Sequence, residues 1–343
     1  MIPESLVSSS EMSPATPPAE LSVVLVAGSG ASGIVRTMRH LAAQTARRRM
    51  EVLVVAESAA GFDLASLGGS EFAASRIVEV GPITARGVAA ARGMLAASSP
   101  IVGLIEDHSF PEPEWAEALL RAHVGSWTGV GPAVGNANPE SVGSWVNYIL
   151  AYGGFAPPQS AGERDLLPWH NSSYKRDALA PFEDRLGALL EWEGALQAEL
   201  RSRGHALYLE PAARTDHSNV SAPWSTVGLN MQRGRILGAQ RAERERWPAW
   251  RRLLQAAAFP LFPLLQLRHI RPQMQRLPVP PALRSRVFVG VVGTLGVLAV
   301  AEAWGLLAGA GDAVARIEDY ELHRLRHLSR RDREALAAPA PAV

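Results

Sequence analysis

Residues 100–115, PIVGLIEDHSFPEPEW, decide the fold because they join a short apolar run to a cluster of ionisable side chains. The run 100–105 has the length and the apolar composition of a buried strand. The triplet Glu106-Asp107-His108 follows it directly. Because open α/β sheets bind ligands beyond the carboxyl ends of their strands, the stretch predicts a buried strand that ends in a polar site.

Strand-length and helix-length segments alternate around this stretch. Apolar runs predict strands over 21–27 (LSVVLVA), 51–56 (EVLVVA) and, less extensively, 76–80. Helical periodicity or composition predicts helices over 34–48, over 86–98 and from about Pro113. Downstream we expect a loop-rich middle over 125–162, a helix over 186–203 and a strand over 206–209. The alternation predicts an α/β fold with a mostly parallel sheet flanked by helices.

Composition narrows the class of protein. The chain has 343 residues, of which 47% are hydrophobic and 20% charged, so it has the composition of a folded protein. Its net charge of +1 gives no sign of a nucleic-acid partner. Cysteine is absent, which excludes disulfides, thiolate nucleophiles and sulfur-ligated zinc. Lys175 is the only lysine, and the alanine- and arginine-rich composition is typical of a bacterial protein.

Three regions follow from composition. Residues 1–20 are rich in proline and serine and lack the apolar stretch of a secretory signal, so we expect a disordered segment and a cytoplasmic fold. Residues 21–228 carry the strand–helix alternation. Arginine-rich and apolar segments then replace it, and we expect residues 229–343 to form a helical, membrane-associated region.

Glycines follow the first expected strand in the sequence GSGASG. Gly28, Gly30 and Gly33 have the G-x-G-x-x-G spacing, and Glu57 follows the second strand, where a dinucleotide-binding protein has its ribose-binding acid. A NAD(P)-dependent oxidoreductase is therefore one hypothesis. A tight turn between a strand and a helix explains the same glycines without a cofactor.

Several segments together resemble the family-2 glycosyltransferases of GT-A fold. The resemblance runs in order over about residues 21–220. It includes LAAQT (41–45), EVLVVAES (51–58), GMLAASS (93–99) before the acidic triplet, WHNSSYKR (169–176) and LLEWEGALQAELRSRGHALYLEP (189–211). The triplet stands where the family usually has D-x-D. The resemblance implies a GT-A-type Rossmann-like sheet and an enzyme that uses a nucleotide-sugar donor.

The resemblance also implies a donor site and a metal site. Ala27, Gly28, Glu57, Glu106 and Asp107 would bind the nucleotide sugar. The metal ligands would be Asp107, His108 and His217. A divalent cation, Mn²⁺ or Mg²⁺, would neutralise the leaving diphosphate. Histidine in place of the family's last aspartate favours manganese, or else a weak or absent dependence on metal.

On the acceptor side, the resemblance places Glu193 at the family's catalytic aspartate. A carboxylate there would accept the proton of the attacking hydroxyl in an inverting transfer. Glu191 is the second candidate. His170, Asn171 and Trp192 would contact the acceptor. Solvated loop or helix-end residues are the structural alternative for these positions and for the triplet.

The C-terminal third contains one long apolar stretch, 287–310, interrupted by Glu302. Arginines flank it on both sides, which a single crossing of the membrane disfavours. We therefore expect peripheral or re-entrant helices on the cytoplasmic face of the membrane. The alternative is packing on the catalytic domain or in a dimer interface.

These expectations describe a bacterial, inverting, metal-assisted glycosyltransferase at the membrane surface. Its acceptor would be a saccharide or lipid-linked molecule of the cell envelope. The rival hypotheses are the oxidoreductase and a GT-A-like module that binds a nucleotide sugar without turnover.

Overall fold

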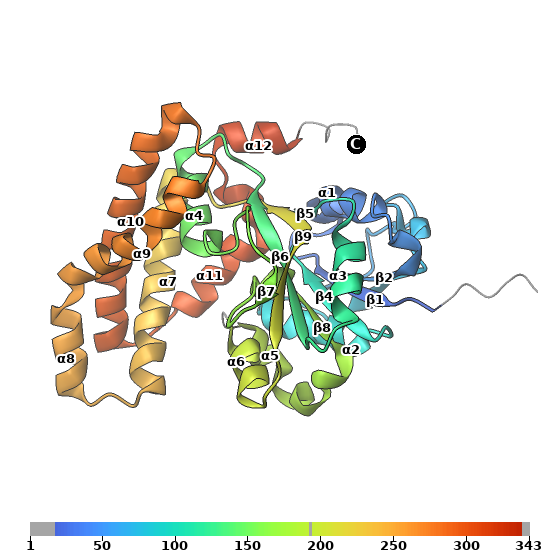
Figure 1. The fold of residues 1–343 in the computed structure, drawn as a ribbon, viewed down its shortest axis with the longest axis horizontal. Helices are drawn as coiled ribbons and strands as arrows, with labels where there is room; N and C mark the ends of the chain where they lie inside the picture. Colours follow the sequence, from blue (N-terminus) through green and yellow to red (C-terminus); the bar gives the residue numbers. More distant parts are fainter. Residues whose placement is uncertain (1–17, 192–193, 338–343) are drawn as a thin grey trace, which may run out of the picture.

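The computed structural model describes residues 18–191 and 194–337, and these form a nine-stranded sheet covered by helices on both faces (Figure 1). The strand order is β3-β2-β1-β4-β8-β6-β9-β5, and β7 pairs with β9. The α/β class, with a sheet flanked by helices and a helical C-terminal region, is confirmed. The sheet is mixed rather than mostly parallel, because four of the eight strand pairings in the described residues are antiparallel. Most of the expected disordered segment 1–20 lies outside the described residues. The strands are β1 (Leu21–Val26), β2 (Met50–Ala56), β3 (Ala74–Glu79), β4 (Ile101–Ile105), β5 (Ser109–Pro111), β6 (Gly129–Asn136), β7 (Gly162–Glu163), β8 (Ser173–Lys175) and β9 (Leu207–His217).

Because of the directions in which the strands run, the ends of segments that are distant in sequence lie at the same edge of the sheet. Strands β3, β2, β1 and β4 run parallel to one another. Strand β8 is antiparallel to both β4 and β6, and β9 is parallel to β6. The carboxyl ends of β1, β4, β6 and β9 therefore lie on the same side of the sheet, together with the start of β8.

Alternating side chains of the strands build a core on each face of the sheet. In β1, Leu21, Val23 and Leu25 pack with α1 (Ala31–Ala42) and α3 (Trp115–His123), whereas Val24 joins the opposite core. The opposite core includes residues of α2 (Arg86–Ala96), α4 (Val142–Tyr152), α5 (Leu186–Glu191) and α6 (Ala195–Ser202). Both faces are buried, which is why these strands are continuously apolar.

The prediction of a loop-rich middle over 125–162 is wrong. This segment contains the inner strand β6 and the helix α4. Strand β6, GVGPAVGN, has a proline and three glycines, which are usually depleted in strands. The pairing with β9 shifts register between Pro132 and Ala133, and an irregularity of this kind accommodates a proline inside a sheet.

The helix expected over 186–203 is two helices. Helix α5 ends at Glu191, and α6 begins after Gly194, whose φ of 76° requires a left-handed backbone. Glycine adopts that conformation without the steric cost that a Cβ imposes. Residues 192 and 193 lie outside the described part of the chain.

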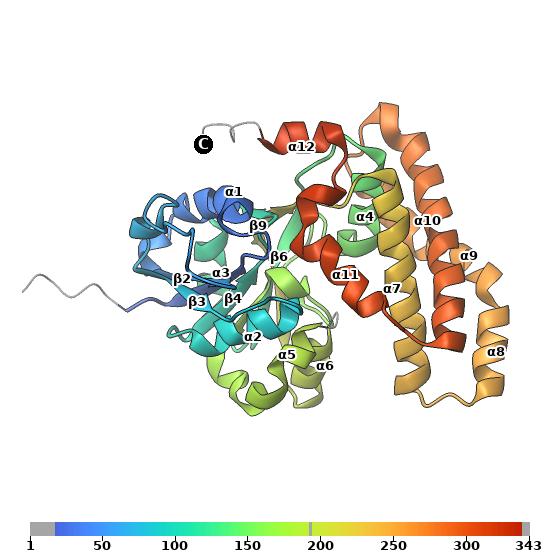
Figure 2. The same ribbon diagram turned by 180° about the vertical axis from the view of Figure 1, so that it is seen from behind.

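Six α-helices form the C-terminal third as far as residue 337, where the described part of the chain ends. They are α7 (Pro223–Arg244), α8 (Ala249–Ala257), α9 (Phe262–Arg276), α10 (Pro281–Ala308), α11 (Ala313–Leu322) and α12 (Arg330–Ala337). Figure 2 shows α7 and α10 side by side and α11 returning toward the sheet. Residue 228, the expected boundary, lies inside α7, so this helix belongs to both of the expected regions.

Helix α10 covers most of the apolar stretch 287–310, and its acid faces the protein. Glu302 is 5% exposed and forms an ion pair with Arg241 of α7. Among the described helices, α10 is the one with the length and apolar composition needed to cross a membrane. Less than half of the most apolar 18-residue segment of this helix is buried against the rest of the protein.

Small residues let α7 and α10 approach closely, which gives a test of this packing. A Cβ on Gly305 would overlap the carbonyl oxygen of Arg235, whereas a Cβ on Gly296 would meet no atom within 4 Å. We expect Gly305→Ala to destabilise the protein by about 1–3 kcal/mol, as overpacking does. Gly296→Ala, on the same helix, should be neutral or stabilising by up to about 1 kcal/mol. Thermal unfolding followed by circular dichroism would compare them, and equal midpoints would contradict the packing.

Candidate active site

Three buried side chains meet at the carboxyl edge of the sheet. Glu106 follows the last residue of β4, and His217 is the last residue of β9. The Glu106 Oε2 atom lies 3.3 Å from His217 Nε2, and Glu106 Oε1 lies 3.8 Å from His108 Nε2. One ligand atom from each lies within 4.8 Å of the others. The chain thus gathers one carboxylate and two imidazoles from strands more than a hundred residues apart.

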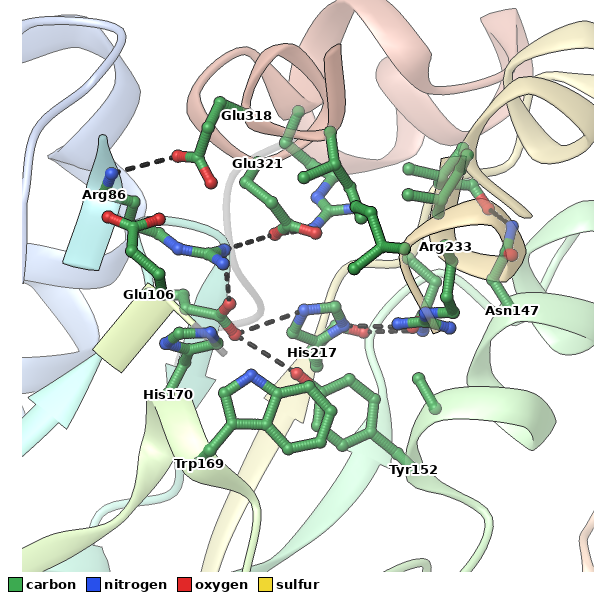
Figure 3. Close-up of a pocket in the computed structure, with 18 of the residues that line it drawn as sticks. Arg86, Glu106, Asn147, Tyr152, Trp169, His170, His217, Arg233, Glu318 and Glu321 are labelled. Carbon is green, nitrogen blue, oxygen red and sulfur yellow. Dashed lines mark hydrogen bonds and ion pairs between the residues drawn. The ribbon is translucent and has the colours of Figure 1, made fainter. Parts of the chain in front are cut away.

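Residues from three other elements hold Glu106 in place, and Figure 3 shows two of them, Arg86 and Tyr152. Asn171, in the 3₁₀ turn η3 (Trp169–Asn171), donates a hydrogen bond of 2.8 Å to Glu106 Oε2. The Tyr152 hydroxyl donates to the same oxygen at 3.3 Å. Arg86, at the start of α2, places Nη1 3.7 Å from Oε1. This arrangement satisfies a carboxylate that is removed from water.

Burial and neighbouring charges set the ionisation of the cluster. Burial alone would raise the pKa of Glu106, but the adjacent His108 and His217 outweigh it and hold that pKa well below its usual range. Burial lowers the pKa of His217, although Glu106 partly offsets this. Burial, aided by the charge of Arg86, lowers the pKa of His170 to about 3. At neutral pH the site therefore combines the ionised carboxylate of Glu106 with neutral imidazoles at His217 and His170.

The three side chains fit a divalent cation. Carboxyl and imidazole groups bind metal ions in their deprotonated forms, and this donor set suits manganese among other first-row metals. His217 Nε2 is buried without a well-aligned hydrogen bond, as expected of an atom free to bind a cation. His108 Nδ1 lies 2.7 Å from Asp107 Oδ1, an orienting contact typical of ligating histidines. Arg324 donates to His108 Nε2 at 2.9 Å, so this nitrogen is engaged in the described conformation.

The residues expected to bind the nucleotide lie in different surroundings. Ala27 is buried, and the backbone of Gly28 is covered by Leu322 of α11. Glu57 directly follows the end of β2 and is exposed. It accepts a hydrogen bond of 3.1 Å from the backbone N–H of Ile83. Glu106 and Asp107 belong to the cluster. Gly28, Glu106 and Asp107 therefore lie together at the carboxyl edge of the sheet, beyond the ends of β1 and β4. Glu57 lies beyond the end of β2, on the side of β1 that faces away from β4.

The residues expected on the acceptor side are divided in the same way. His170 and Asn171 adjoin Glu106, beside a cavity of about 100 Å³ lined also by Tyr152 and Trp169. Glu191 lines this cavity too, and its Oε1 accepts a hydrogen bond of 3.2 Å from the backbone N–H of Val88. That bond places Glu191 at the N-terminus of α2. Trp192 and Glu193 lie outside the described residues.

Sequence patterns did not indicate four residues of the site. Tyr152 and Arg86 contact Glu106 directly. Glu321, near the end of α11, contacts Arg86, and Arg324, two residues beyond that helix, contacts His108. Arg86 is the first residue of α2, and no sequence motif surrounds it. Arg324 follows His108 by 216 positions, so no local pattern connects the two. Only the alternation of strands, which places position 86 near the carboxyl edge, could have indicated Arg86.

No known family's sequence model and no curated protein matches the chain. Among solved structures, the mannosyltransferase PcManGT from Pyrobaculum calidifontis with GDP-Man and Mn²⁺ matches at 14% identity over 94% of this chain and 79% of that one, with a TM-score of 0.47. GalNAc-T7 with UDP, GalNAc and Mn²⁺ matches at 13% over 59% of this chain, with a TM-score of 0.45. The chain spans 43% of GalNAc-T7. TarS residues 1–349 of S. aureus with UDP-GlcNAc match at 11% over 80% of this chain and 72% of that one, with a TM-score of 0.43. The function proposed below rests on the residues of the site.

The donor set predicts a measurable affinity for metal. We expect the purified protein to bind Mn²⁺ in isothermal titration, and His217→Ala to weaken that affinity by at least about tenfold, the lower limit for a disturbed metal site. His205→Ala is the control, because His205 hydrogen-bonds Thr128 outside the cluster. Equal Mn²⁺ affinities for wild type and His217→Ala would exclude His217 as a ligand.

Proposed function

We propose that the chain is a metal-assisted glycosyltransferase of family 2 and GT-A type, which transfers a sugar from a nucleoside-diphosphate donor to an acceptor hydroxyl. The observation that carries the proposal is the buried group Glu106, His108 and His217 directly beyond β4 and β9. The same residues carry the sequence resemblance: Glu106 and His108 belong to the triplet that stands in place of the family's D-x-D, and the resemblance implies His217 as a further metal ligand. A divalent cation, Mn²⁺ or Mg²⁺, would be held by His108 and His217 with Glu106 or Asp107 and would neutralise charge on the leaving diphosphate.

The donor would lie along the carboxyl ends of β1, β2 and β4. The backbone at Ala27 and Gly28 offers a close approach to the nucleotide, and Glu57 is available to hydroxyls at the outer end of β2. Glu106 is held rigidly by Asn171 and by the Tyr152 hydroxyl, which suits a residue that must orient the donor. Asp107 keeps the imidazole of His108 in one orientation through the 2.7 Å contact.

The acceptor would approach the cavity beside Tyr152, Trp169 and His170. Trp169 stacks on Tyr152 with ring centroids 6.3 Å apart, and aromatic surfaces of this kind suit sugar rings. Asn171 would act through Glu106, and Trp192 would complete the acceptor side. A carboxylate at the acceptor end removes the hydroxyl proton as that oxygen attacks the anomeric carbon, which inverts its configuration. We assign this role to Glu193, with Glu191 as the alternative.

The oxidoreductase hypothesis has less support from the structure. Gly30 has a φ of 72° and is the N-cap residue of α1, so its backbone conformation alone accounts for a glycine. The glycine turn does not account for the buried carboxylate and imidazoles of Glu106, His108 and His217, whereas the metal site of a glycosyltransferase does. The non-catalytic alternative differs from the enzyme only in turnover.

A donor screen tests the proposed activity. We expect slow hydrolysis of one or a few UDP- or GDP-sugars in Mn²⁺, measured as released nucleotide. Glu193→Gln should lower turnover by about 10²-fold or more, the scale of a lost general base, while UDP or GDP binding persists. Glu183→Gln, an exposed acid elsewhere, should leave turnover unchanged. Nucleotide binding without turnover on any donor or acceptor would favour the non-catalytic module, and NAD binding would favour the oxidoreductase.

We further propose that residues 229–343 attach the enzyme to the cytoplasmic face of a bacterial membrane. Large apolar side chains of α8, α9 and the turn between them are exposed: Trp250, Leu253, Leu254, Leu261, Leu264 and Leu265 are 58–66% exposed. Positions 247–301 contain seven arginines and no acid. An apolar face edged by arginines suits an anionic lipid surface. A lipid-linked or cell-envelope saccharide acceptor would be reached from that surface.

Vesicle binding tests this attachment. The double variant Leu254→Glu with Leu264→Glu should reduce co-sedimentation with vesicles containing phosphatidylglycerol, because it introduces two charges into the exposed apolar face. Val124→Glu changes a side chain that is 89% exposed at the end of α3 and serves as the control. High salt should release part of the wild-type protein, since each arginine contributes about 1 kcal/mol near an anionic surface. Binding unaffected by the double variant would place the membrane contact elsewhere.

A further inference from the structure

The end of α11 and the turn after it enter the donor side of the site. We call residues 313–327, which comprise α11 and the 3₁₀ turn η7 (Arg324–His327), the C-terminal arm. Its residues Glu321, Leu322 and Arg324 lie against the ends of β1 and β4. Figure 3 shows Glu321 opposite Arg86 and above Glu106. The arm therefore occupies the region in which we place the donor.

Arg324, a cationic residue of the arm, lies where we propose that the metal ion binds. The Arg324 guanidinium is 6% exposed and donates to His108 Nε2 at 2.9 Å. His108 Nε2 is the nitrogen nearest Glu106, and the opposite nitrogen is engaged by Asp107. A metal on His108 would have to bind where Arg324 now donates. Arg324 and a divalent cation are therefore alternatives on this imidazole.

An anion of the arm lies next to that cation. The Glu321 carboxylate is 2.5 Å from Arg324 Nη2 and 2.8 Å from Arg86 Nη1. Burial would raise the pKa of Glu321, but the charges of Arg324 and Arg86 outweigh it and bring that pKa to about 2. The carboxylate is thus ionised between two guanidinium groups. A diphosphate oxygen would be held well by the same pair, because arginine forks suit phosphate and carboxylate alike.

Leu322 closes the remaining space. Its Cδ2 atom would lie 2.5 Å from a Cβ placed on Gly28, so the side chain rests on the backbone itself. The Ser29 hydroxyl donates to the Leu322 carbonyl at 2.6 Å and fixes the arm there. The cavity left between Glu106, Asp107, Arg86 and Leu322 measures about 30 Å³. Pockets for small molecules usually measure about 300–1,000 Å³, so a nucleotide sugar does not fit between these four residues while the arm is in place. A larger cavity of about 460 Å³ is lined by Ser29, Asp107, His108 and Arg324, but Glu106 and Arg86 do not line it.

We propose that the C-terminal arm closes the donor site by imitating its ligands: Arg324 takes the place of the metal ion, and Glu321 takes the place of the donor diphosphate. This inference rests on the proposed function. The metal and the nucleotide bind only when the arm withdraws, so arm and ligands compete. The imitation keeps the buried charges of Glu106 and Arg86 compensated in the empty enzyme, since an unpaired buried charge is costly.

The first test removes the charge of Glu321 in the full-length protein. UDP, GDP and inorganic pyrophosphate are titrated in Mn²⁺ into wild type, Glu321→Gln and the exposed control Glu183→Gln. Glu321→Gln should bind the diphosphates about 5- to 150-fold more tightly, the usual range of a coupling between two sites, because Arg86 loses its internal partner. The control should match wild type.

The outcomes of this test separate the two proposals. Equal affinities for wild type and Glu321→Gln would overturn the competition while leaving donor binding intact. Weaker binding in Glu321→Gln would also overturn it, because Glu321 would then assist the donor. If none of the three proteins binds UDP, GDP or pyrophosphate, the proposed function fails, and the inference fails with it.

The second test locks the arm in place. A Cβ on Gly28 would lie 3.0 Å from the Cβ of Leu322, slightly closer than the roughly 3.5–4.5 Å that a disulfide needs. The chain has no other cysteine, so Gly28→Cys with Leu322→Cys forms one defined crosslink. The oxidised protein should lose Mn²⁺-dependent UDP and GDP binding, and reduction should restore it to the level of the two single variants. Unchanged binding in the oxidised protein would show that the arm does not close the site.

Discussion

The buried carboxylate of Glu106 is the constraint on which the site depends. A charged group removed from water must be compensated by hydrogen bonds and opposite charge. Asn171, Tyr152 and Arg86 supply these from three separate elements, and His217 completes the group. Because one side chain needs all of these partners, the turn before β8, the end of α4 and the start of α2 must converge at the end of β4.

Strand register makes this convergence possible. The parallel pairing of β6 with β9 brings Asn136 opposite His217, and the register shift after Pro132 adjusts where β9 ends. The antiparallel β8 reverses the chain, so that His170 and Asn171 precede that strand at the same edge. Small displacements of these ends would move His217 away from Glu106, which is 3.3 Å distant. The geometry of the site is thus a property of the whole sheet.

Local patterns of apolar residues were sufficient to predict the strands in the first half of the sheet but not those in the second half. Strands β1, β2 and β4 are unbroken apolar runs, and the triplet after β4 marks the polar edge directly. Strand β6 was missed because glycine and proline conceal its pattern, although its neighbours on both sides keep it buried. Arg324 and Glu321 could not be found from sequence, because their partners lie more than two hundred residues away. Contacts of that kind depend on how the C-terminal helices return to the sheet.

The return of the arm is linked mechanically to the helices that we place at the membrane. Helix α10 ends at Ala308 and α11 begins at Ala313, with Gly309 and Gly311 between them in left-handed conformations. Arg235 of α7 donates to the Gly309 carbonyl at 3.0 Å and so fastens this connection to the helix that packs along α10. Glycine adopts both signs of φ readily, so a change of direction in this connection would require release of the contacts of Arg235 with Gly309 and Asp312, but no repacking of α7 on α10. Withdrawal of the arm would release the contacts that Ser29, His108 and Arg86 make with its end. It would also break the hydrogen bonds that the backbone N–H groups of Ser221 and Ala222 donate to the His327 carbonyl, and the packing of Tyr320 on Gly228 of α7, so the arm and α7 are coupled.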